Sequence, residues 1–557
     1  MKSGGDRTAL TGPPAGDGAP PPAPDEIPAQ PGAMATGWLA RVRRLSRWRP
    51  SLEQLAVLLL GLLVLLVHDV EYMLRQSFWA DEAWVAVSTR FPLSQLPVTT
   101  SSSPIGWSVL VRLVTVSGTQ TSRLLPLAFA GAAVVTAYWL ARGIGWRWET
   151  ASVTAGLAAA LGVLLVPAML VRDDLKQYTA EAFTALLTLA LTSRLERKWS
   201  RAGLVALSIS VWAGMLFSNA VAFVGVAAFV AVCIIQAARR AWHRLAEAVV
   251  AGGLTGVLML AVYEAFDARA MTPLNASTYW PHFFLPVSQG LRASAAFVIG
   301  HFEGVRADFG LGPWWLAVPL VVAGLVTMVR LGRPATALAV IVLWPEMLTL
   351  SALKKYPFLN LRTSTFLFAI TVVVAAIGLV GLCSLLRPRL TGWVAAGLGA
   401  VAVIAFAIGA QPYVRSHPIP DEDVRGQTLY VAAHAAPHDV IVVSLASNWG
   451  FAYYWPSGQP ARRATSADMQ QYVAYFPDQP RIVVASARDA AGVDAALSHA
   501  LAEARPYRCA RIWLVRTHVV RGEPAAWAAA LRRHGQSSTR VGPGGLAVIQ
   551  AGGSACQ

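Results

Sequence analysis

Apolar runs long enough to cross a membrane recur along most of this chain, and they limit what it can fold into. Of its 557 residues, 55% are hydrophobic and only 14% are charged, which is more apolar surface than a soluble domain can bury. A helix needs about 17–25 apolar residues to span a bilayer. The sequence therefore predicts a polytopic α-helical membrane protein with about eleven transmembrane helices. The runs lie near 54–74, 123–141, 151–171, 178–194, 201–217, 219–237, 246–265, 313–330, 336–352, 364–386 and 391–410.

The distribution of basic residues predicts how these helices are oriented. A net charge of +16 would suggest a nucleic-acid partner in a soluble protein. In a membrane protein, however, Lys and Arg gather in cytoplasmic loops, so we expect no nucleic acid. With the N-terminus inside, all the short basic connections fall on the cytoplasmic side, and the chain after residue 410 is external. The expected location is the plasma membrane. These connections are Arg142–Arg147, Arg194–Arg201, Arg239–Arg244, Arg330–Arg333 and Arg387–Arg389.

Composition divides the chain into three parts. Residues 1–49 are rich in Pro, Gly and Ala before a basic stretch, which indicates a disordered cytoplasmic N-terminus. Residues 50–410 form the membrane domain. Residues 411–557 have a soluble composition, in which the strand-like runs "DVIVVS", "RIVVAS", "RIWLVR" and "GLAVIQ" alternate with helical segments such as "PAAWAAALRRHG". This pattern predicts an extracytoplasmic α/β accessory domain with a largely parallel sheet, where Cys509 and Cys556 could pair.

One apolar segment decides the side on which two adjacent acids lie. The stretch 104–116, "PIGWSVLVRLVTV", is too short to span and carries Arg112 near its middle. If it crossed the membrane, every later loop would be inverted and the basic connections would lie outside. We therefore predict a helix lying in the outer interface. Asp81 and Glu82, between the tryptophans of "SFWADEAWVA", then face the exterior at the membrane surface.

Further charged residues are predicted at the same depth on the same side. In "VRDDLKQYTAEAF", Asp174, Gln177, Tyr178 and Glu181 follow the i, i+3, i+4, i+7 spacing of one helix face. External cations are also expected close to the bilayer, against the general trend of this chain. They could simply anchor helix ends, but the convergence of acids and bases favours a substrate cavity. These cations are Arg172, Lys176, Lys354, Lys355 and Arg362.

An external cavity of this kind suits sugar transfer from a polyprenyl phosphate to an acceptor hydroxyl. The departing lipid phosphate needs Lys or Arg to offset its charge. The hydroxyl needs a carboxylate as its general base. Adjacent acids disfavour each other's ionisation, so one could be the base while the other orients the substrate or a cation. A nucleotide-sugar donor would require a cytosolic phosphate-binding domain, for which the cytoplasmic loops are too short.

Several motifs resemble glycosyltransferase family 39, a branch of the C-type membrane glycosyltransferases that includes relatives of protein O-mannosyltransferases and lipid A aminoarabinose transferase. "DEAW" at 81–84 resembles the family's acidic pair in the first outer loop. "DLKQYTAE" at 174–181 resembles "ELKQYS-x-D/E", and "KYPFLNLRTSTFLF" at 355–368 resembles a "YPFGxGR…LFL" segment. "RLLPLAFAG" at 123–131 is similar to the start of the family's second helix. The resemblance covers roughly residues 50–390.

The resemblance implies an inverting glycosyltransferase that transfers a hexose or pentose without a nucleotide. Asp81 would be the catalytic base and Glu82 its catalytic partner. Metal dependence varies among the relatives, so a divalent cation stays open. The partners would be the polyprenyl-phosphate donor, the bilayer, and an extracytoplasmic acceptor on a cell-envelope glycan, lipid or protein. Residues expected to bind the donor's phosphate or sugar are Asp174, Lys176, Tyr178, Glu181, Lys355, Tyr356 and Arg362.

This sequence departs from the family's pattern at two places. Asp174 stands where Glu is usual, and Leu359–Asn360 replace glycines before Arg362. The second departure affects the shape of the loop on the phosphate side.

Two other classes of function compete with this interpretation. Buried charges also mark the pathways of transporters, so a transporter or flippase of a lipid-linked glycan is the main alternative. No inverted repeat and no pair of broken helices is visible in the two halves of the sequence. A structural partner that docks through its external domain is the third class. An enzyme would consume the lipid-linked sugar, whereas a transporter would only move it.

Overall fold

The computed structural model describes residues 51–99, 103–116, 118–170, 175–268, 280–386, 397, 422–464 and 472–550. Every predicted apolar run from 54–74 to 364–386 contains a helix, whereas 391–410 falls outside the described residues apart from residue 397. The helices that follow these runs are α2 (Leu52–Leu62), α3 (Val64–Val67), α8 (Leu124–Arg142), α9 (Glu149–Leu165), α11 (Tyr178–Arg197), α12 (Arg201–Gly214), α13 (Ala220–Ala238), α14 (Trp242–Val262), α18 (Trp314–Arg330), α19 (Pro334–Ala352) and α20 (Thr365–Leu386).

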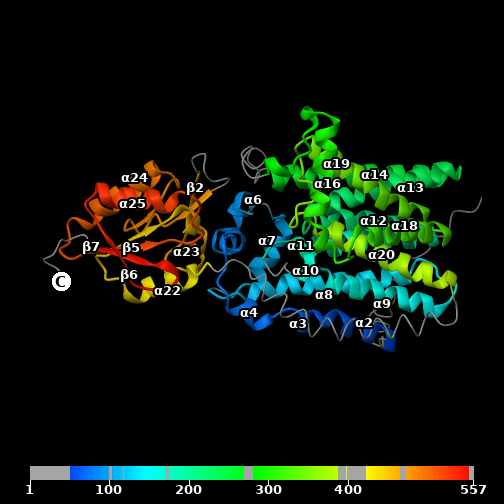
Figure 1. Ribbon diagram of the computed structural model, residues 1–557, viewed down its shortest axis with the longest axis horizontal. Helices are drawn as coiled ribbons and strands as arrows, with labels where there is room; N and C mark the ends of the chain where they lie inside the picture. The colour runs from blue at the N-terminus through cyan, green and yellow to red at the C-terminus, as the bar shows by residue number, and fades with distance from the viewer. Residues whose placement is uncertain are drawn as a thin grey trace, which may run out of the picture. The chain divides into compact units, whose positions relative to one another are not determined.

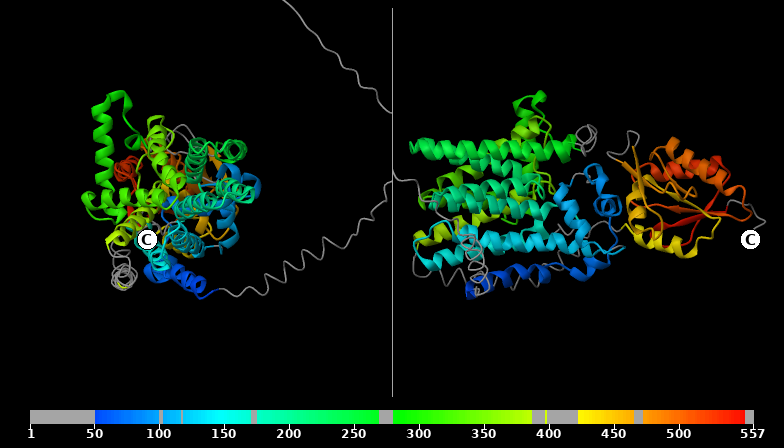
Figure 2. Two further views of the ribbon diagram at one scale, coloured as in Figure 1. Left: turned by 90° about the vertical axis from the view of Figure 1, so that its right-hand side faces the viewer. Right: turned by 180° about the vertical axis from the view of Figure 1, so that it is seen from behind.

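The long helices have the length and surface of membrane helices. Within the described ranges, five are long and apolar enough to span a bilayer: Thr121–Arg142, Ala220–Ala238, Trp242–Asp267, Pro334–Ala352 and Thr365–Leu385. Seen nearly end-on, the long helices run side by side (Figure 2, left). On α14, Val250, Leu254 and Val257 are 69%, 61% and 65% exposed, and such a surface is stable only against lipid. The chain is a multi-pass membrane protein, and the total of about eleven spans stays a prediction.

Glycines allow the helices of the bundle to approach closely. A Cβ at Gly378 of α20 would lie 1.9 Å from the carbonyl oxygen of Leu320 on α18. A Cβ at Gly324 of α18 would lie 2.0 Å from the carbonyl oxygen of Val374 on α20. Both distances are impossible for a real side chain, so α18 and α20 meet through glycine backbone, as small residues permit in membrane helix pairs. This contact holds α20, whose start carries part of the site described below.

Short helices connect α3 to α8. They are α4 (Val70–Arg75), α5 (Ala80–Val87), α6 (Leu96–Thr99) and α7 (Ile105–Val114). The predicted helix within 104–116 is confirmed as α7. Its 10 residues extend roughly 15 Å, about half the thickness of a bilayer core. Its placement in the outer interface stays a prediction.

The C-terminal part contains the predicted sheet, but the sheet is mixed rather than largely parallel. The four predicted runs form β1 (Val440–Val443), β4 (Ile482–Val484), β5 (Arg511–Val515) and β7 (Ala547–Gln550), and the strand order is β4-β1-β5-β7-β6. β1 pairs in parallel with β4 and β5, whereas β7 pairs antiparallel with β5 and with β6 (Ser538–Arg540). The antiparallel β6–β7 pair follows from the short turn between these strands, where Gly544 and Gly545 have φ of 57° and 87°, because a connection this short can join only antiparallel strands.

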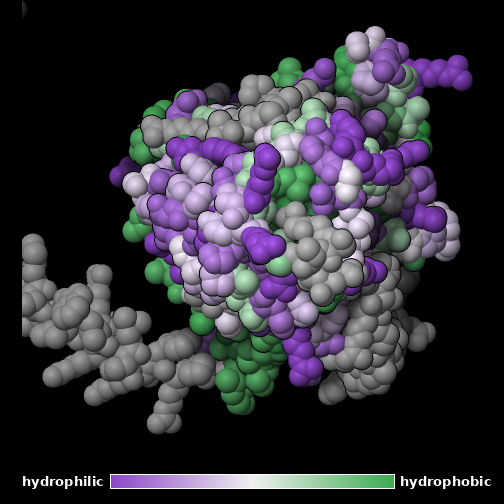
Figure 3. Space-filling model, turned by 90° about the vertical axis from the view of Figure 1, so that its left-hand side faces the viewer, coloured by the Kyte–Doolittle hydropathy of each residue, from purple (hydrophilic) through white to green (hydrophobic). Residues whose placement is uncertain are grey.

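Helices cover both faces of this sheet, so its strands are apolar on both sides. α24 (Ala490–Ala504) and α25 (Glu523–Arg533) lie on one face, and α22 (Val424–His434) lies on the other (Figure 1). Val440 and Val442 join the core with α24 and α25, while Ile441 and Val443 join the core with α22. The face of this domain in Figure 3 is mostly hydrophilic, as expected for a domain in water.

The second of these two cores is not confined to the C-terminal domain. It also contains Phe78, Trp84 and Trp107 from the segment between α4 and α8. Trp84 of α5 stacks on Trp449 of α23 (Asn448–Tyr454), with ring centroids 4.8 Å apart. The segment with the acidic pair is therefore packed into the apolar core of the α/β domain.

Candidate active site

The acidic pair lies in the first turn of α5, which its own sequence and neighbours stabilise. Trp79 precedes the helix in an extended conformation, and its N–H donates to the Glu82 carboxylate at 3.3 Å, the returning half of a capping box. Acidic residues in a first turn also complement the positive end of the helix dipole. At the other end, the Ser88 hydroxyl donates to the carbonyl of Val85 at 2.6 Å. The helix is only 8 residues long, so these contacts define its position.

Asp81 forms an ion pair with Arg362, which lies 281 residues further along the chain. The Asp81 and Arg362 side chains are 20% and 27% exposed, so both still reach solvent. The guanidinium also lies over the ring of Trp79, 4.4 Å from its centroid. The structure thus brings together two residues predicted for opposite roles, a base and a phosphate ligand.

Backbone geometry before α20 sets the position of Arg362. The Asn360 side-chain oxygen accepts the N–H groups of Arg362 at 3.0 Å and Thr363 at 3.3 Å, a local turn typical of Asn. Leu359 has a φ of 47°, which costs a non-glycine residue about 1–2 kcal/mol. Its side chain is 0% exposed in the core, so packing offsets this strain. The loop therefore contains a left-handed residue where the family's pattern has glycine.

Glu82 is enclosed, unlike its neighbour Asp81. It pairs with Arg123, and both side chains are 0% exposed. One Glu82 oxygen accepts from Nε of Arg123 at 2.7 Å and from the backbone N–H of Leu175 at 2.9 Å. Arg123 also donates to the carbonyls of Gln76 at 2.7 Å and Ser77 at 3.1 Å. This buried pair joins three of the motifs, "DEAW", "RLLPLAFAG" and "DLKQYTAE", at one point, and it leaves Glu82 no access to a substrate.

Arg123 is the site residue that sequence reasoning missed. It was placed only within the motif "RLLPLAFAG", as the start of a helix. Its position could have indicated a role, because Arg123 lies at the predicted outer end of a membrane helix, whereas most basic residues of this chain are predicted on the cytoplasmic side.

The residues of the motif "DLKQYTAE", at 174–181, lie around α5 and α11 and are buried where they are described. The ammonium of Lys176, which is 3% exposed, lies 5.1 Å from the ring centroid of Trp84. Tyr178 begins α11 and is 7% exposed. Glu181, one turn further, is 1% exposed, and its Oε2 has no hydrogen-bond partner among the described residues. Asp174 lies outside the described residues.

The residues of the motif at 355–368 differ in their exposure. The Tyr356 hydroxyl donates to the carbonyl of Thr363 at 2.8 Å, and its ring contacts Phe223 edge to face at 4.8 Å. Tyr356 therefore braces the loop that carries Arg362. Lys355 is exposed at the end of α19. The site as described thus centres on the pair of Asp81 and Arg362, with Glu82 and Tyr356 as supports, while Lys176 lies over Trp84 of the helix that carries Asp81.

No group of three or more His, Cys, Asp or Glu residues within the described ranges is placed to hold a metal ion. Asp81 and Glu82 are each engaged by an arginine. A divalent cation therefore stays an open expectation.

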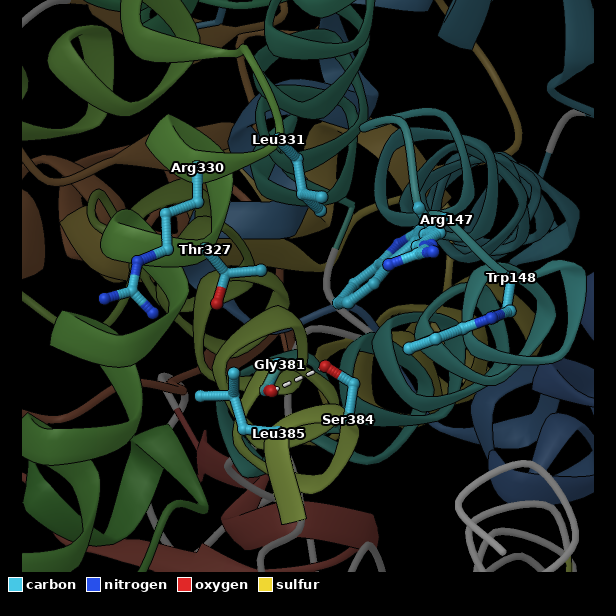
Figure 4. Close-up of a pocket in the computed structure, with 9 residues that line it drawn as sticks. Arg147, Trp148, Thr327, Arg330, Leu331, Gly381, Ser384 and Leu385 are labelled. Carbon is cyan, nitrogen blue, oxygen red and sulfur yellow. Dashed lines mark hydrogen bonds between the residues drawn. The ribbon is translucent and has the colours of Figure 1, made fainter. Parts of the chain in front are cut away.

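A cavity of about 160 Å³ lies at the opposite ends of the same helices. Figure 4 shows Thr327 and Arg330 of α18 on one side, Arg147 and Trp148 on the other, and Ser384 of α20 between them. Arg123 precedes α8 and Arg147 follows it, so this 19-residue helix separates the acidic pair from the cavity by roughly 28 Å. Arg147 and Arg330 belong to the predicted cytoplasmic connections, and the cavity is not part of the candidate active site.

Comparisons with known proteins identify solved structures of similar shape. No family model and no curated protein sequence matches the chain. ArnT from Cupriavidus metallidurans, a lipid A aminoarabinose transferase solved in the apo state, aligns with a TM-score of 0.52 at 13% identity, over 94% of this chain and 99% of that chain. The oligosaccharyltransferase of Archaeoglobus fulgidus, solved with Zn and sulfate, aligns with a TM-score of 0.46 at 13% identity over 72% of this chain. This chain spans 61% of the length of that protein.

Proposed function

We propose, from the C-type glycosyltransferase fold that this chain shares with ArnT, that it is a membrane glycosyltransferase. It transfers a hexose or pentose from a polyprenyl-phosphate donor to an extracytoplasmic hydroxyl, with inversion at the anomeric carbon. The acceptor is a cell-envelope glycan, lipid or protein. Fold alone does not determine chemistry, so the proposal depends on the site.

The observation that carries the proposal is the partly exposed ion pair of Asp81 and Arg362. The reaction requires a carboxylate and a cation close together, because the acceptor loses a proton while the donor's phosphate gains charge. In the absence of substrates these two groups neutralise each other. A donor phosphate competes for the guanidinium of Arg362, and the Asp81 carboxylate then becomes available to the acceptor hydroxyl.

The bond changes follow from these two roles. The acceptor oxygen attacks the anomeric carbon and its proton passes to Asp81. The bond between the anomeric carbon and the phosphate oxygen breaks, and its electron pair leaves with polyprenyl phosphate. Arg362 binds two oxygens of that phosphate in a fork, with Lys176 as a second cation. Glu82 acts by position, since its pairing with Arg123 holds the first turn of α5.

A donor-consumption assay tests this function against the transporter alternative. The purified protein is supplied with a panel of polyprenyl-phosphate hexoses and pentoses and with envelope glycan, lipid and protein fractions. We expect release of free polyprenyl phosphate that depends on an acceptor. Translocation of an unconsumed donor in proteoliposomes would instead identify a flippase and refute the proposal.

We further propose that the site faces the exterior, because the basic connections then lie inside. Ser457 and Lys198 are both exposed and lie on opposite predicted sides. In a variant whose free thiols Cys233 and Cys383 are replaced by serine, a membrane-impermeant thiol reagent should label Ser457→Cys but not Lys198→Cys in intact cells. The reverse labelling would place the site in the cytoplasm and exclude an external acceptor.

A further inference from the structure

The helix that carries Asp81 receives a hydrogen bond from a distant part of the chain. The N–H of Ala80, the first residue of α5, donates to the Glu422 carboxylate at 3.0 Å, across a sequence separation of 342 residues. Glu422 lies just before α22 of the α/β domain, and its side chain is 10% exposed. A carboxylate at a helix N-terminus is favoured both by the dipole and by the unpaired N–H groups there. Here the acid comes from another domain.

Two neighbouring contacts fix the segment that leads into α5. The N–H of Phe78 donates to the Tyr454 hydroxyl at 3.0 Å, and the N–H of Arg425 donates to the Ser77 hydroxyl oxygen at 3.1 Å. Together with the Glu422 bond, these contacts hold the chain immediately before Asp81. A displacement of this segment would move the Asp81 carboxylate directly, because Asp81 is the next residue after Ala80.

His518 contacts the Glu422 oxygen that does not accept from Ala80. Its Nδ1 pairs with the second Glu422 oxygen. The His518 backbone has a φ of 51°, a left-handed conformation that is uncommon outside glycine and concentrated at functional sites. The centroid of the imidazole ring lies 6.5 Å from that of the Trp79 ring, and the guanidinium of Arg362 also lies over Trp79.

We propose that Glu422 and His518 are positioning residues of the active site, through which the α/β domain fixes the Asp81 carboxylate and the ring of Trp79 beneath Arg362. This inference rests on the proposed function, because it assigns the two residues to the same reaction. Neither residue contacts the reacting atoms. Glu422 acts on Asp81 through the first turn of α5, and His518 orients Glu422.

Simple docking of the domain does not require this charged pair. The apolar contact between Trp84 and Trp449 and the rings of Phe78 and Tyr453, 5.4 Å apart, already join the two regions. Partly buried charges lose hydration energy and are retained where their geometry is needed. This geometry directs the Glu422 carboxylate at the first N–H of α5.

The arrangement predicts a pH dependence with a defined sign. The hydrogen bond to Glu422 raises the pKa of His518, burial opposes this, and of the nearby charges Asp81 adds to the increase while Arg488 reduces it. The charged pair is therefore complete below the ordinary His pKa of about 6.5. It is lost as the pH rises through the raised pKa of His518. Turnover should fall as the pH rises through the raised pKa of His518.

The test uses the full-length protein and two readouts. Glu422→Ala should lower kcat by about 10–100-fold, the effect of a small misplacement of a catalytic group, while the KM for the donor changes by less than about threefold. His518→Asn keeps a hydrogen-bond donor without a titratable ring, so its activity should exceed that of His518→Ala and should not fall as the pH rises through the range in which His518 titrates. Amide hydrogen exchange of the peptide 77–87 should be faster in Glu422→Ala.

A second acid–histidine pair in the same domain provides the control. His534 lies 3.1 Å from Asp494, with side chains 27% and 30% exposed, and His534→Asn should change neither readout. If amide exchange is faster in Glu422→Ala but the wild-type protein consumes no donor, the contact is supported and the proposed function is refuted. Unchanged exchange and an unchanged pH profile in both Glu422→Ala and His518→Asn would overturn this inference.

Discussion

Asp81→Asn is expected to lower kcat by about 10²–10⁴-fold, the contribution of a general base, and to leave the protein folded. Asparagine has nearly the shape of aspartate but cannot accept the acceptor's proton. Asp81 and its ion-pair partner Arg362 are both partly exposed, so loss of the charge has little effect on folding. The measurement is turnover of the polyprenyl-phosphate sugar in detergent, with thermal unfolding recorded on the same sample.

The neighbouring acid supplies the matched control. Glu82→Gln leaves Arg123 charged in a fully buried site, and breaking a buried ion pair costs about 3–5 kcal/mol of stability. We therefore expect Glu82→Gln to unfold at a clearly lower temperature, whereas Asp81→Asn does not. Activity of Asp81→Asn within a few-fold of wild type would remove Asp81 from the role of base.

Arg362→Ala is expected to reduce turnover by about 10²-fold or more, the scale found when a charge-stabilising donor is removed. The guanidinium can bind two phosphate oxygens in a planar fork, and it also stacks on Trp79. Lysine offers a point charge without the fork or the stacking, so Arg362→Lys should recover only part of the activity. Turnover is measured against donor concentration for both variants in detergent, where anchoring to a bilayer no longer matters.

The exposed Arg75 provides the control for this pair of variants. It forms a surface pair with Glu71, with side chains 78% and 70% exposed, and Arg75→Ala should behave like wild type. If Arg362→Lys is fully active, the guanidinium only anchors the helix end. If Arg362→Ala is also fully active, Lys176, Lys354 or Lys355 must hold the phosphate.

The local pattern of the sequence was enough to predict most of the helices and strands that hold the candidate site. Apolar runs of membrane length became helices from α2 to α20, and four apolar runs in the C-terminal domain became β1, β4, β5 and β7. The sheet order was not predictable in the same way. The antiparallel addition of β6 depends on a glycine turn at 544–545, and three polar exposed residues give β6 no apolar signature.

Residues of the candidate site were predictable only where a charged residue lies at the end of an apolar run. Asp81 and Arg362 are charged residues at predicted outer helix ends, so their proximity follows from the topology. The burial of Glu82 depends on Arg123 and Leu175, which reach it from two other segments. Glu422 and His518 lie in a domain whose residues carry no motif, and no local pattern indicates a contact over 342 residues.

The aromatic core shared by the outer segment and the α/β domain has a consequence for how the protein is made. Phe78 and Trp84 are synthesised early, whereas their partners Tyr453 and Trp449 come much later. At about 5–20 residues per second, the 342 residues between Ala80 and Glu422 take roughly 20–70 s to translate. During that interval α5 has no domain to pack against. A chain that stops before the last domain therefore leaves the aromatic surface of α5 exposed, without the rings of Trp449 and Tyr453 that cover it in the full-length protein.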